Sequence, residues 1–386
     1  MVVPSSISTA KPASDITVSE AIIKVVRSGK KSAASLVKEI FKLQFGPGKI
    51  TPQEYFYFRL FDDDTYSWEQ KKKFVGISAQ HKIISSFGSP EYWWTAHDKL
   101  IFYGLMQGLG FPTAKILAIH DPIRTFGAVP ALKTKEDLAD FLRTGMQYPF
   151  FSKPVTGLYS AGAASISRYD QHNDSLITTA GEAMGVEDFT DILGGLDEPS
   201  YLFQEFTHPH EKIMEICGDR LATVRMILLM KDQGPEIFRC LWKIPAGDNI
   251  ADNYWRHGNM LADLDPETGR VVRVVRGYGF DFEQPETHPD SQKPLLGFEM
   301  PDWQKMKDLC FSASRTLPNL KMQAWDVTAS REGPILVEMN VGGDFNLPQI
   351  ATSNGIMDER FTDFINDYAI KLKKSEKIAV KSPWQA

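Results

Sequence analysis

The first hundred residues show the spacing of apolar side chains that is typical of helices. From residue 21 to residue 43, the pattern is that of an amphipathic helix with its basic positions facing outward. The segment Thr17-Val18-Ser19-Glu20 has the form of a capping box, and Thr51-Pro52-Gln53-Glu54 repeats this start signal with proline at the first helical position. Helical patterns follow over 67–75 and 97–109.

These patterns define a mostly helical N-terminal region over 16–110. The preceding residues, 1–15, are small and polar, so we expect a disordered tail without the apolar run of a signal peptide. Beyond residue 110, short strands and hairpins predominate and helices stand apart from them. This arrangement predicts an α+β fold and not an alternating parallel sheet. We expect one α+β unit over 111–200 and a second over 201–386.

Three kinds of segment are expected in the α+β part of the chain. Single strands are expected over 114–119, 148–153, 201–206, 221–231 and 237–243. Hairpins are expected where turn residues separate two apolar runs, over 260–275 and 322–340. Helices are expected over 134–144, 301–316 and 358–373.

Composition narrows the class of protein. With 386 residues, of which 42% are hydrophobic, the chain is long enough for two or three domains with a sizeable core. The formal charge of −6 argues against a nucleic-acid-binding protein, which usually has a basic surplus. Cys217, Cys240 and Cys310 lack the spacing of a zinc motif or a disulfide framework. No apolar run approaches the roughly 20 residues of a membrane span, so we expect a cytoplasmic protein.

The hairpin over 322–340 carries the most informative polar residues. Its turn is centred near residue 332, so facing residues should have numbers that add up to about 664, as those of Asp326 and Glu338 do. Asn340, two residues beyond Glu338, should lie on the same face. Two carboxylates and an amide oxygen suit Mg²⁺ or Mn²⁺. Alternatively, the carboxylates are solvated and paired with lysine or arginine. The apolar residues beside them favour the metal site.

A second candidate element is a lysine at the end of an apolar strand, followed by a loop of small residues. Lys153 ends the strand, and the loop contains Gly157, Ser160 and Gly162. An ammonium group and backbone N–H groups in such a loop can hold phosphates, although the spacing is not that of a P-loop. Arg225 is a further candidate, because an isolated charge within an apolar strand needs a buried partner such as a phosphate.

Together these segments resemble the ATP-grasp superfamily, and most closely its group associated with sugar transfer. The resemblance covers most of the chain. It rests on the order of four segments along the chain. These are the Lys-Pro pair with its glycine-rich loop, Gln204-Glu205-Phe206 after a strand, Thr223-Val224-Arg225, and finally Asp326 followed by the Glu-x-Asn pattern of Glu338 and Asn340. It implies an α+β fold in which two subdomains clamp ATP.

The resemblance also implies roles for individual residues. Nucleotide contacts are implied for Lys99, Lys153, Gly157, Ser160, Gly162, Gln204, Glu205, Phe206 and Glu211. Mg²⁺ would be held by Asp326, Glu338 and Asn340. Asn253, His257 and His288 would line the pocket for the acceptor. Many relatives carry an arginine two residues before the first metal carboxylate, where this chain has Ala324. Catalytic roles toward the transferred phosphoryl group are therefore assigned to Arg225, with Lys153.

The activity that the resemblance implies is ligation. Such an enzyme activates a carboxylate as an acyl phosphate, which an amine, or a thiol or hydroxyl, then attacks. The first alternative is a phosphotransferase that acts on the hydroxyl of a small molecule or sugar. The second is a nucleotide-binding module without catalysis, which we would expect to lack Asp326, Glu338 or Asn340. The sequence identifies neither small-molecule substrate, and it leaves the oligomeric state open.

Overall fold

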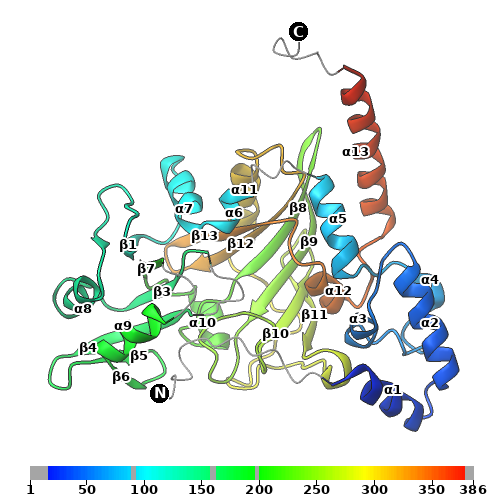
Figure 1. Cartoon of the computed structure of the whole chain (residues 1–386), viewed down its shortest axis with the longest axis horizontal. Helices are drawn as coiled ribbons and strands as arrows, with labels where there is room; N and C mark the ends of the chain where they lie inside the picture. Colours follow the sequence, from blue (N-terminus) through cyan, green and yellow to red (C-terminus); the bar gives the residue numbers. More distant parts are fainter. Residues whose placement is uncertain (1–15, 88–92, 157–161, 196–199, 379–386) are drawn as a thin grey trace.

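The computed structural model describes residues 16–87, 93–156, 162–195 and 200–378, with side chains described as far as residue 369. The predicted tail over 1–15 and the predicted loop residues Gly157 and Ser160 lie outside these ranges. Two β-sheets lie side by side, and the first helices of the chain lie beyond the second sheet (Figure 1). The chain is therefore a mixed α+β protein with a helical N-terminal region.

The N-terminal region is helical, as predicted. Its helices are α1 (Val18–Arg27), α2 (Ala33–Phe45), α3 (Pro52–Tyr57), α4 (Trp68–Lys71), α5 (Ile77–Ser86), α6 (Trp94–His97) and α7 (Lys99–Gly108). Capping boxes at Thr17 and Thr51 begin α1 and α3, which confirms both start signals. The single helix expected over 21–43 is wrong. The chain turns at Gly29, whose φ of 74° is one that glycine adopts readily, and α2 begins after it.

The first sheet has seven strands in the order β2-β1-β7-β3-β4-β5-β6. The strands are β1 (Ile116–His120), β2 (Ala131–Leu132), β3 (Phe150–Pro154), β4 (Ala164–Asp170), β5 (Ser175–Thr178), β6 (Ala183–Gly185) and β7 (Tyr201–Glu205). Helices α8 (Lys135–Thr144) and α9 (Val186–Gly194) contribute to one hydrophobic core with this sheet. Because β7 joins the first sheet, that sheet extends a few residues past position 200.

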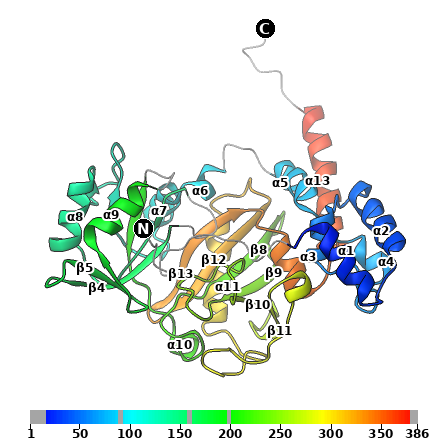
Figure 2. The same ribbon diagram turned by 60° about the horizontal axis from the view of Figure 1, so that its bottom comes forward.

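The second sheet has six strands in the order β11-β10-β9-β8-β12-β13. They are β8 (Val224–Lys231), β9 (Gly234–Ile244), β10 (Met260–Leu264), β11 (Val271–Arg276), β12 (Met322–Ser330) and β13 (Gly333–Val341). The remaining elements are α10 (Glu211–Cys217), the short turn η2 (Gly279–Asp281), α11 (Trp303–Ser314), α12 (Asn346–Thr352) and α13 (Glu359–Ile378). Helix α11 packs on one face of the sheet (Figure 2), while α12 and the N-terminal helices share a core with residues of the other face.

The hairpin of β12 and β13 has the register that the sequence predicted, since Asp326 pairs with Glu338. Near the turn, Thr328 pairs with Ile335, and a β-bulge between Asp326 and Val327 then shifts the register by one residue. Without this bulge Asp326 would lie opposite Val337, and the carboxylate of Glu338 would not face it. The bulge therefore brings the two carboxylates together.

Candidate functional site

A row of charged side chains crosses the second sheet. Antiparallel pairing places Arg225 of β8 opposite Asp326 of β12, and Asp326 opposite Glu338 of β13. Arg225 donates from Nε to Asp326 Oδ1 (2.8 Å) and from Nη2 to Oδ2 (2.7 Å). Lys243 of β9 also donates to Oδ2, at 2.9 Å. Since Asp326 is only 1% exposed, both of its carboxylate oxygens are held by cations in the interior.

A second carboxylate supports Lys243 from the loop after β9. Asp252 Oδ1 lies 3.6 Å from Lys243 Nζ. Its Oδ2 accepts hydrogen bonds from the backbone N–H (2.7 Å) and the hydroxyl (2.6 Å) of Thr223. Burial raises the pKa of Asp252, against the opposing effects of Lys243 and Thr223. The sequence reasoning missed Lys243 and Asp252. Lys243 could have been found by the signal that identified Arg225, a lone charge within an apolar strand.

Burial and charge act in opposite directions on this cluster. Burial alone would raise the pKa of Asp326, but the charges of Arg225 and Lys243 hold that pKa well below its ordinary value. Burial alone would lower the pKa of Lys243, but Asp252 and Asp326 raise it above its ordinary value. The pKa of Arg225 is likewise raised, because Asp326 outweighs burial. At neutral pH the pair of Arg225 and Asp326, with Lys243, is therefore fully charged.

The part of the hairpin nearest to solvent holds the other two predicted metal ligands. The side chain of Glu338 is 32% exposed, and its Oε1 lies 3.7 Å from Arg225 Nη2. Asn340 Nδ2 donates to Glu338 Oε1 at 3.3 Å, so the two side chains lie on one face as predicted. Asp344, in the segment after β13, has a pKa that is raised by burial and lowered in part by Arg225. Glu338 and Asn340 thus present oxygen atoms that suit a hard cation.

Asp326 fits the predicted metal site less well than Glu338 and Asn340. Its oxygens already accept three hydrogen bonds from charged donors, whereas a directly bound Mg²⁺ would need one of them. Among the described residues, no group of three or more His, Cys, Asp or Glu side chains could hold a metal ion. A site with one or two protein ligands still suits Mg²⁺, which usually keeps waters and phosphate oxygens as its other ligands.

The predicted nucleotide residues Lys153 and Gln204 meet at Tyr103 of α7. Lys153 Nζ donates to Tyr103 Oη (3.1 Å), and Tyr103 Oη donates to the carbonyl of Val337 (2.8 Å) in β13. Gln204 Oε1 lies 3.4 Å from the same hydroxyl, while its Nε2 is buried and has no hydrogen-bond partner among the residues that the structure describes. Tyr103, which the sequence reasoning missed, therefore connects strands of both sheets. An unpaired buried donor beside a lysine is suited to a polar ligand.

The other predicted nucleotide residues differ in their surroundings. Lys99 begins α7, and its Nζ lies 3.4 Å from the carbonyl of Val155, just beyond Lys153. Glu205 accepts a hydrogen bond from the backbone N–H of Lys115 (2.9 Å), so its side chain is engaged in the first sheet. Gly162 is buried and has a φ of 76°. The centroid of the Phe206 ring lies 5.0 Å from that of His208, and Glu211 is exposed at the start of α10.

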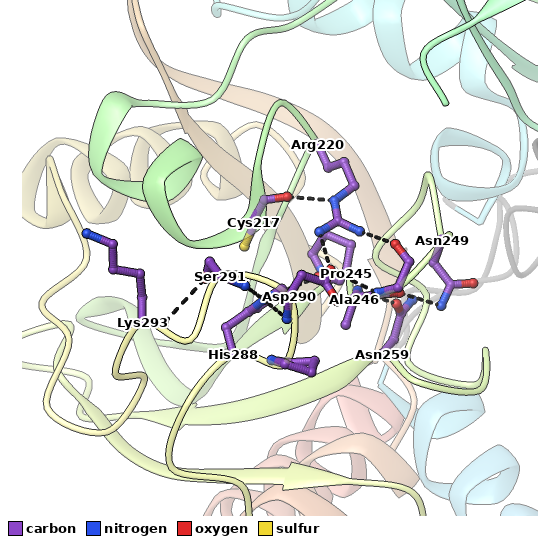
Figure 3. Close-up of polar contacts among 12 residues, drawn as sticks. Cys217, Arg220, Pro245, Ala246, Asn249, Asn259, His288, Asp290, Ser291 and Lys293 are labelled. Carbon is purple, nitrogen blue, oxygen red and sulfur yellow. Dashed lines mark hydrogen bonds and ion pairs between the residues drawn. The ribbon is translucent and has the colours of Figure 1, made fainter. Parts of the chain in front are cut away.

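The predicted acceptor residues lie in or against the loop after β9: the backbone carbonyls of Asn253 and His257 accept hydrogen bonds from Asn259 (2.8 Å) and Asn249 (2.9 Å) within that loop. His288 is fully buried: its Nε2 bonds to the carbonyl of Pro245 (2.9 Å), and its Nδ1 accepts from the backbone N–H of Asp290 (3.2 Å) (Figure 3). This geometry gives His288 a structural role and not the predicted pocket-lining role. Burial also lowers its pKa. Asn253 is half-buried and accepts from the N–H of Trp255 (3.2 Å), while His257 is exposed.

Figure 3 also shows the polar contacts of the neighbouring loop. Arg220 donates from Nη1 to the carbonyl of Gly247 (2.6 Å) and from Nη2 to Asp290 Oδ2 (2.8 Å). Asn259 accepts from the N–H of Ala246 (3.0 Å) through its side-chain oxygen. These contacts fix the loop after β9, which leads to Asp252. His288 therefore belongs to the hydrogen-bond network that fixes this loop.

Comparison with known proteins identifies the family to which the chain belongs. No curated protein matches the chain. A D-alanine–D-alanine ligase structure from Bacillus anthracis is 13% identical, and the match covers 78% of this chain and 77% of that one with a TM-score of 0.41. A phosphoribosylamine–glycine ligase from Thermotoga maritima is 14% identical, covering 78% and 64%, with a TM-score of 0.42. An ADP complex of N5-carboxyaminoimidazole ribonucleotide synthetase is 10% identical, covering 65% and 46%, with a TM-score of 0.37.

The chain thus spans about half the length of the last of these structures and under two thirds of the Thermotoga protein. A stronger statement comes from the sequence. Residues 79–363 match the family model described as sugar-transfer associated ATP-grasp. Because this match covers well over half of the chain, the protein belongs to the sugar-transfer associated ATP-grasp family.

Proposed function

We propose that the protein is an ATP- and Mg²⁺-dependent ligase that activates a carboxylate as an acyl phosphate for attack by an amine, or by a thiol or hydroxyl. ATP-grasp proteins are usually ATP-dependent carboxylate–amine ligases, and this family membership supports the general class. The family supports the proposed reaction class, and the charged cluster described above supports the proposed site residues. The small-molecule carboxylate and nucleophile are open.

The observation that carries the proposal is the charge balance of the cluster. Four carboxyl groups stand near two buried cations, a surplus of up to two negative charges, and burial raises the pKa of two of these carboxyl groups, Asp252 and Asp344. The residues are Asp252, Asp326, Glu338 and Asp344, with Arg225 and Lys243. A divalent cation at Glu338 and Asn340 would offset that surplus. When bound, Mg²⁺ would neutralise part of the charge on the phosphates of ATP.

The protein's own residues would bind and orient the reactants. Gln204 offers its unpaired Nε2 to the nucleotide, and Lys153 offers a positive charge that Tyr103 holds in place. Arg225 is held in a fixed orientation by two hydrogen bonds to Asp326, beside Glu338. In this position it would offset charge that develops during phosphoryl transfer.

The chemistry requires no nucleophile from the protein. A carboxylate oxygen of the substrate attacks the γ-phosphorus of ATP, the bond from phosphorus to the bridging oxygen breaks, and ADP leaves. The second substrate then attacks the carbonyl carbon of the acyl phosphate, inorganic phosphate leaves, and the nucleophile loses a proton. Charge placement and orientation would supply most of the rate enhancement.

The test is product analysis with ATP, Mg²⁺, pools of carboxylic acids and hydroxylamine as the nucleophile. A ligase releases ADP and inorganic phosphate and forms a hydroxamate. A phosphotransferase leaves the phosphoryl group on an acceptor and releases no inorganic phosphate. Thermal unfolding should first show that ATP or GTP with Mg²⁺ stabilises the protein. The absence of any nucleotide-dependent shift would overturn the proposal. The variant Arg225→Ala tests whether turnover depends on the charged cluster.

A further inference from the structure

The first four helices precede the segment that matches the family model, which begins at residue 79. They are nevertheless a fixed part of the molecule. Buried side chains of α1, α2 and α3 form one core with Leu241, Leu261 and Val275 of the second sheet. Figure 2 shows α1, α2 and α4 at the edge of the molecule, on the opposite side from β4 and β5. Their outer surface is therefore presented in a fixed orientation.

The outer face of α2 is apolar. Val37, Phe41 and Phe45 are 57%, 61% and 64% exposed, and their spacing of four residues aligns them as one stripe along the helix. The rings of Phe41 and Phe45 contact each other at a centroid distance of 4.6 Å. The inner face is also apolar and is already buried. Three large exposed apolar side chains in one stripe are a feature of binding surfaces and not of an ordinary solvated helix.

This stripe lies within a basic part of an acidic protein. Residues 16–49 contain seven basic and two acidic residues, a net charge of +5, whereas the whole chain carries −6. Lys38 and Lys42 are exposed directly beside the apolar stripe. The acidic residue of α2, Glu39, is turned inward and accepts a hydrogen bond from Tyr55 at 2.6 Å. The exposed residues of α2 are therefore apolar, polar or positively charged.

We infer that the outer face of α2 docks the protein on a membrane surface that contains anionic lipids. Apolar side chains flanked by lysines on a helix match the boundary between acyl chains and phosphate headgroups. The 13 residues of α2 make it about 20 Å long, enough to lie along a bilayer surface without crossing it. Within the described part of the chain, no helix is long and apolar enough to cross a membrane.

The charge pattern favours lipid over a second copy of the chain. In a symmetric contact, the stripes of two copies would face each other and bring Lys38 and Lys42 of both copies together. Anionic lipid phosphates instead attract each lysine near the surface. This inference does not depend on the proposed ligase reaction, because α2 contributes no residue to the charged cluster of the second sheet.

The experiment measures binding of the full chain to vesicles of phosphatidylcholine alone and of phosphatidylcholine with about one third phosphatidylglycerol. We expect binding to the anionic vesicles, and weaker binding at high salt. Phe41→Ser with Phe45→Ser should reduce the binding constant at least about tenfold, since it removes apolar area that would leave water. Lys38→Glu with Lys42→Glu should abolish the preference for anionic lipid. Ile123→Ser is the matched control, because Ile123 is 85% exposed and lies outside α2.

Each outcome has a defined meaning. Loss of binding in both double variants, with Ile123→Ser unchanged and the nucleotide-dependent thermal shift retained, supports the inference. Failure of the wild-type chain to bind anionic vesicles overturns it, as does equal binding by the Phe41 and Phe45 variant. A chain that is dimeric in light scattering, monomeric in that variant and indifferent to vesicles identifies the stripe as a contact between copies. That result also overturns the membrane assignment.

Discussion

Replacing Asp326 by asparagine tests how the buried charges are held. Asparagine keeps the size of the side chain but leaves Arg225 and Lys243 as two neighbouring buried cations without their shared carboxylate. Removing one partner of a buried ion pair costs about 3–5 kcal/mol. Glu338, 3.7 Å from Arg225, and Asp252, 3.6 Å from Lys243, partly compensate. We therefore expect Asp326→Asn to lower the free energy of unfolding by about 3 kcal/mol.

The assay is denaturant unfolding at neutral pH in the absence of nucleotide and Mg²⁺. Glu338→Gln is the control: its side chain is one third exposed, so it should change stability by less than about 1 kcal/mol. Adding Lys243→Met to Asp326→Asn should recover part of the lost stability, because it removes one of the two cations that have lost their shared carboxylate. An Asp326→Asn protein within about 1 kcal/mol of wild type would falsify the description of Asp326 as the counter-ion that holds both cations.

The stability of Asp326→Asn should also depend on pH differently from that of the wild type. The pKa of Asp326 is held below its ordinary value in the folded protein, so its stabilising effect is present above the unfolded pKa, near 4. That effect is lost as the pH falls below about 4 toward the folded pKa. Wild-type stability should therefore decline more steeply in acid than that of Asp326→Asn. Equal acid dependence in the two proteins would contradict the lowered pKa.

A measurement of metal binding distinguishes the role of Asp326 as a counter-ion of Arg225 and Lys243 from a role as metal ligand. Electron paramagnetic resonance can follow Mn²⁺ binding in the presence of ADP. If Glu338 and Asn340 bind the metal and Asp326 mainly positions Arg225 and Lys243, Glu338→Gln should weaken Mn²⁺ binding much more than Asp326→Asn does. The reverse order would assign Asp326 to the metal, as the sequence first suggested.

Three further outcomes are expected. Glu338→Gln should fold normally yet lower ADP production by at least about a hundredfold, and near-normal turnover would refute a metal role for Glu338. ATP with Mg²⁺ at a hundredfold excess over Kd should stabilise the wild type by about 2.7 kcal/mol in thermal or denaturant unfolding, and Lys153→Ala should lose most of this effect while the exposed Lys133→Ala keeps it. Burial, only partly opposed by nearby arginines, raises the pKa of Asp263 to about 6, so its contribution to stability is lost as the pH rises through that value. Asp263→Asn should therefore be more stable than wild type by about 2 kcal/mol at pH 8 and little different at pH 4, and an equal difference at both pH values would contradict the raised pKa.

Local signals predicted the elements because their physical causes are local. The capping boxes at Thr17 and Thr51 each begin a helix, since the side chain and the N–H group that it caps are only three residues apart. Counting from the turn predicted that Asp326 pairs with Glu338, but this pairing also depends on the β-bulge beside Asp326, which the count did not include. The break between α1 and α2 was missed although the polar run over 27–32 interrupts the apolar pattern at Gly29, whose positive φ lets the chain turn.

Contacts between distant strands could not be counted in this way. The sequence predicted that Arg225 has a buried partner, and the partner that we expected was a transferred phosphate. The partner in the fold is Asp326, because β8 lies next to β12 although 101 residues separate the two side chains. Lys243 and Tyr103 escaped notice for the same reason: their partners lie on strands whose order only the folded sheets define.

The arrangement of these charges bears on how a nucleotide could bind. Arg225 and Lys243 are already neutralised by Asp326 and Asp252, so they add little net positive charge to attract a triphosphate. Glu338 adds a further negative charge at the more exposed end of the row. A free polyanion would therefore meet repulsion here, whereas a nucleotide that carries a divalent cation would bring the missing charge with it. We therefore expect nucleotide and metal to bind as one unit, with Glu338 as the residue that couples them.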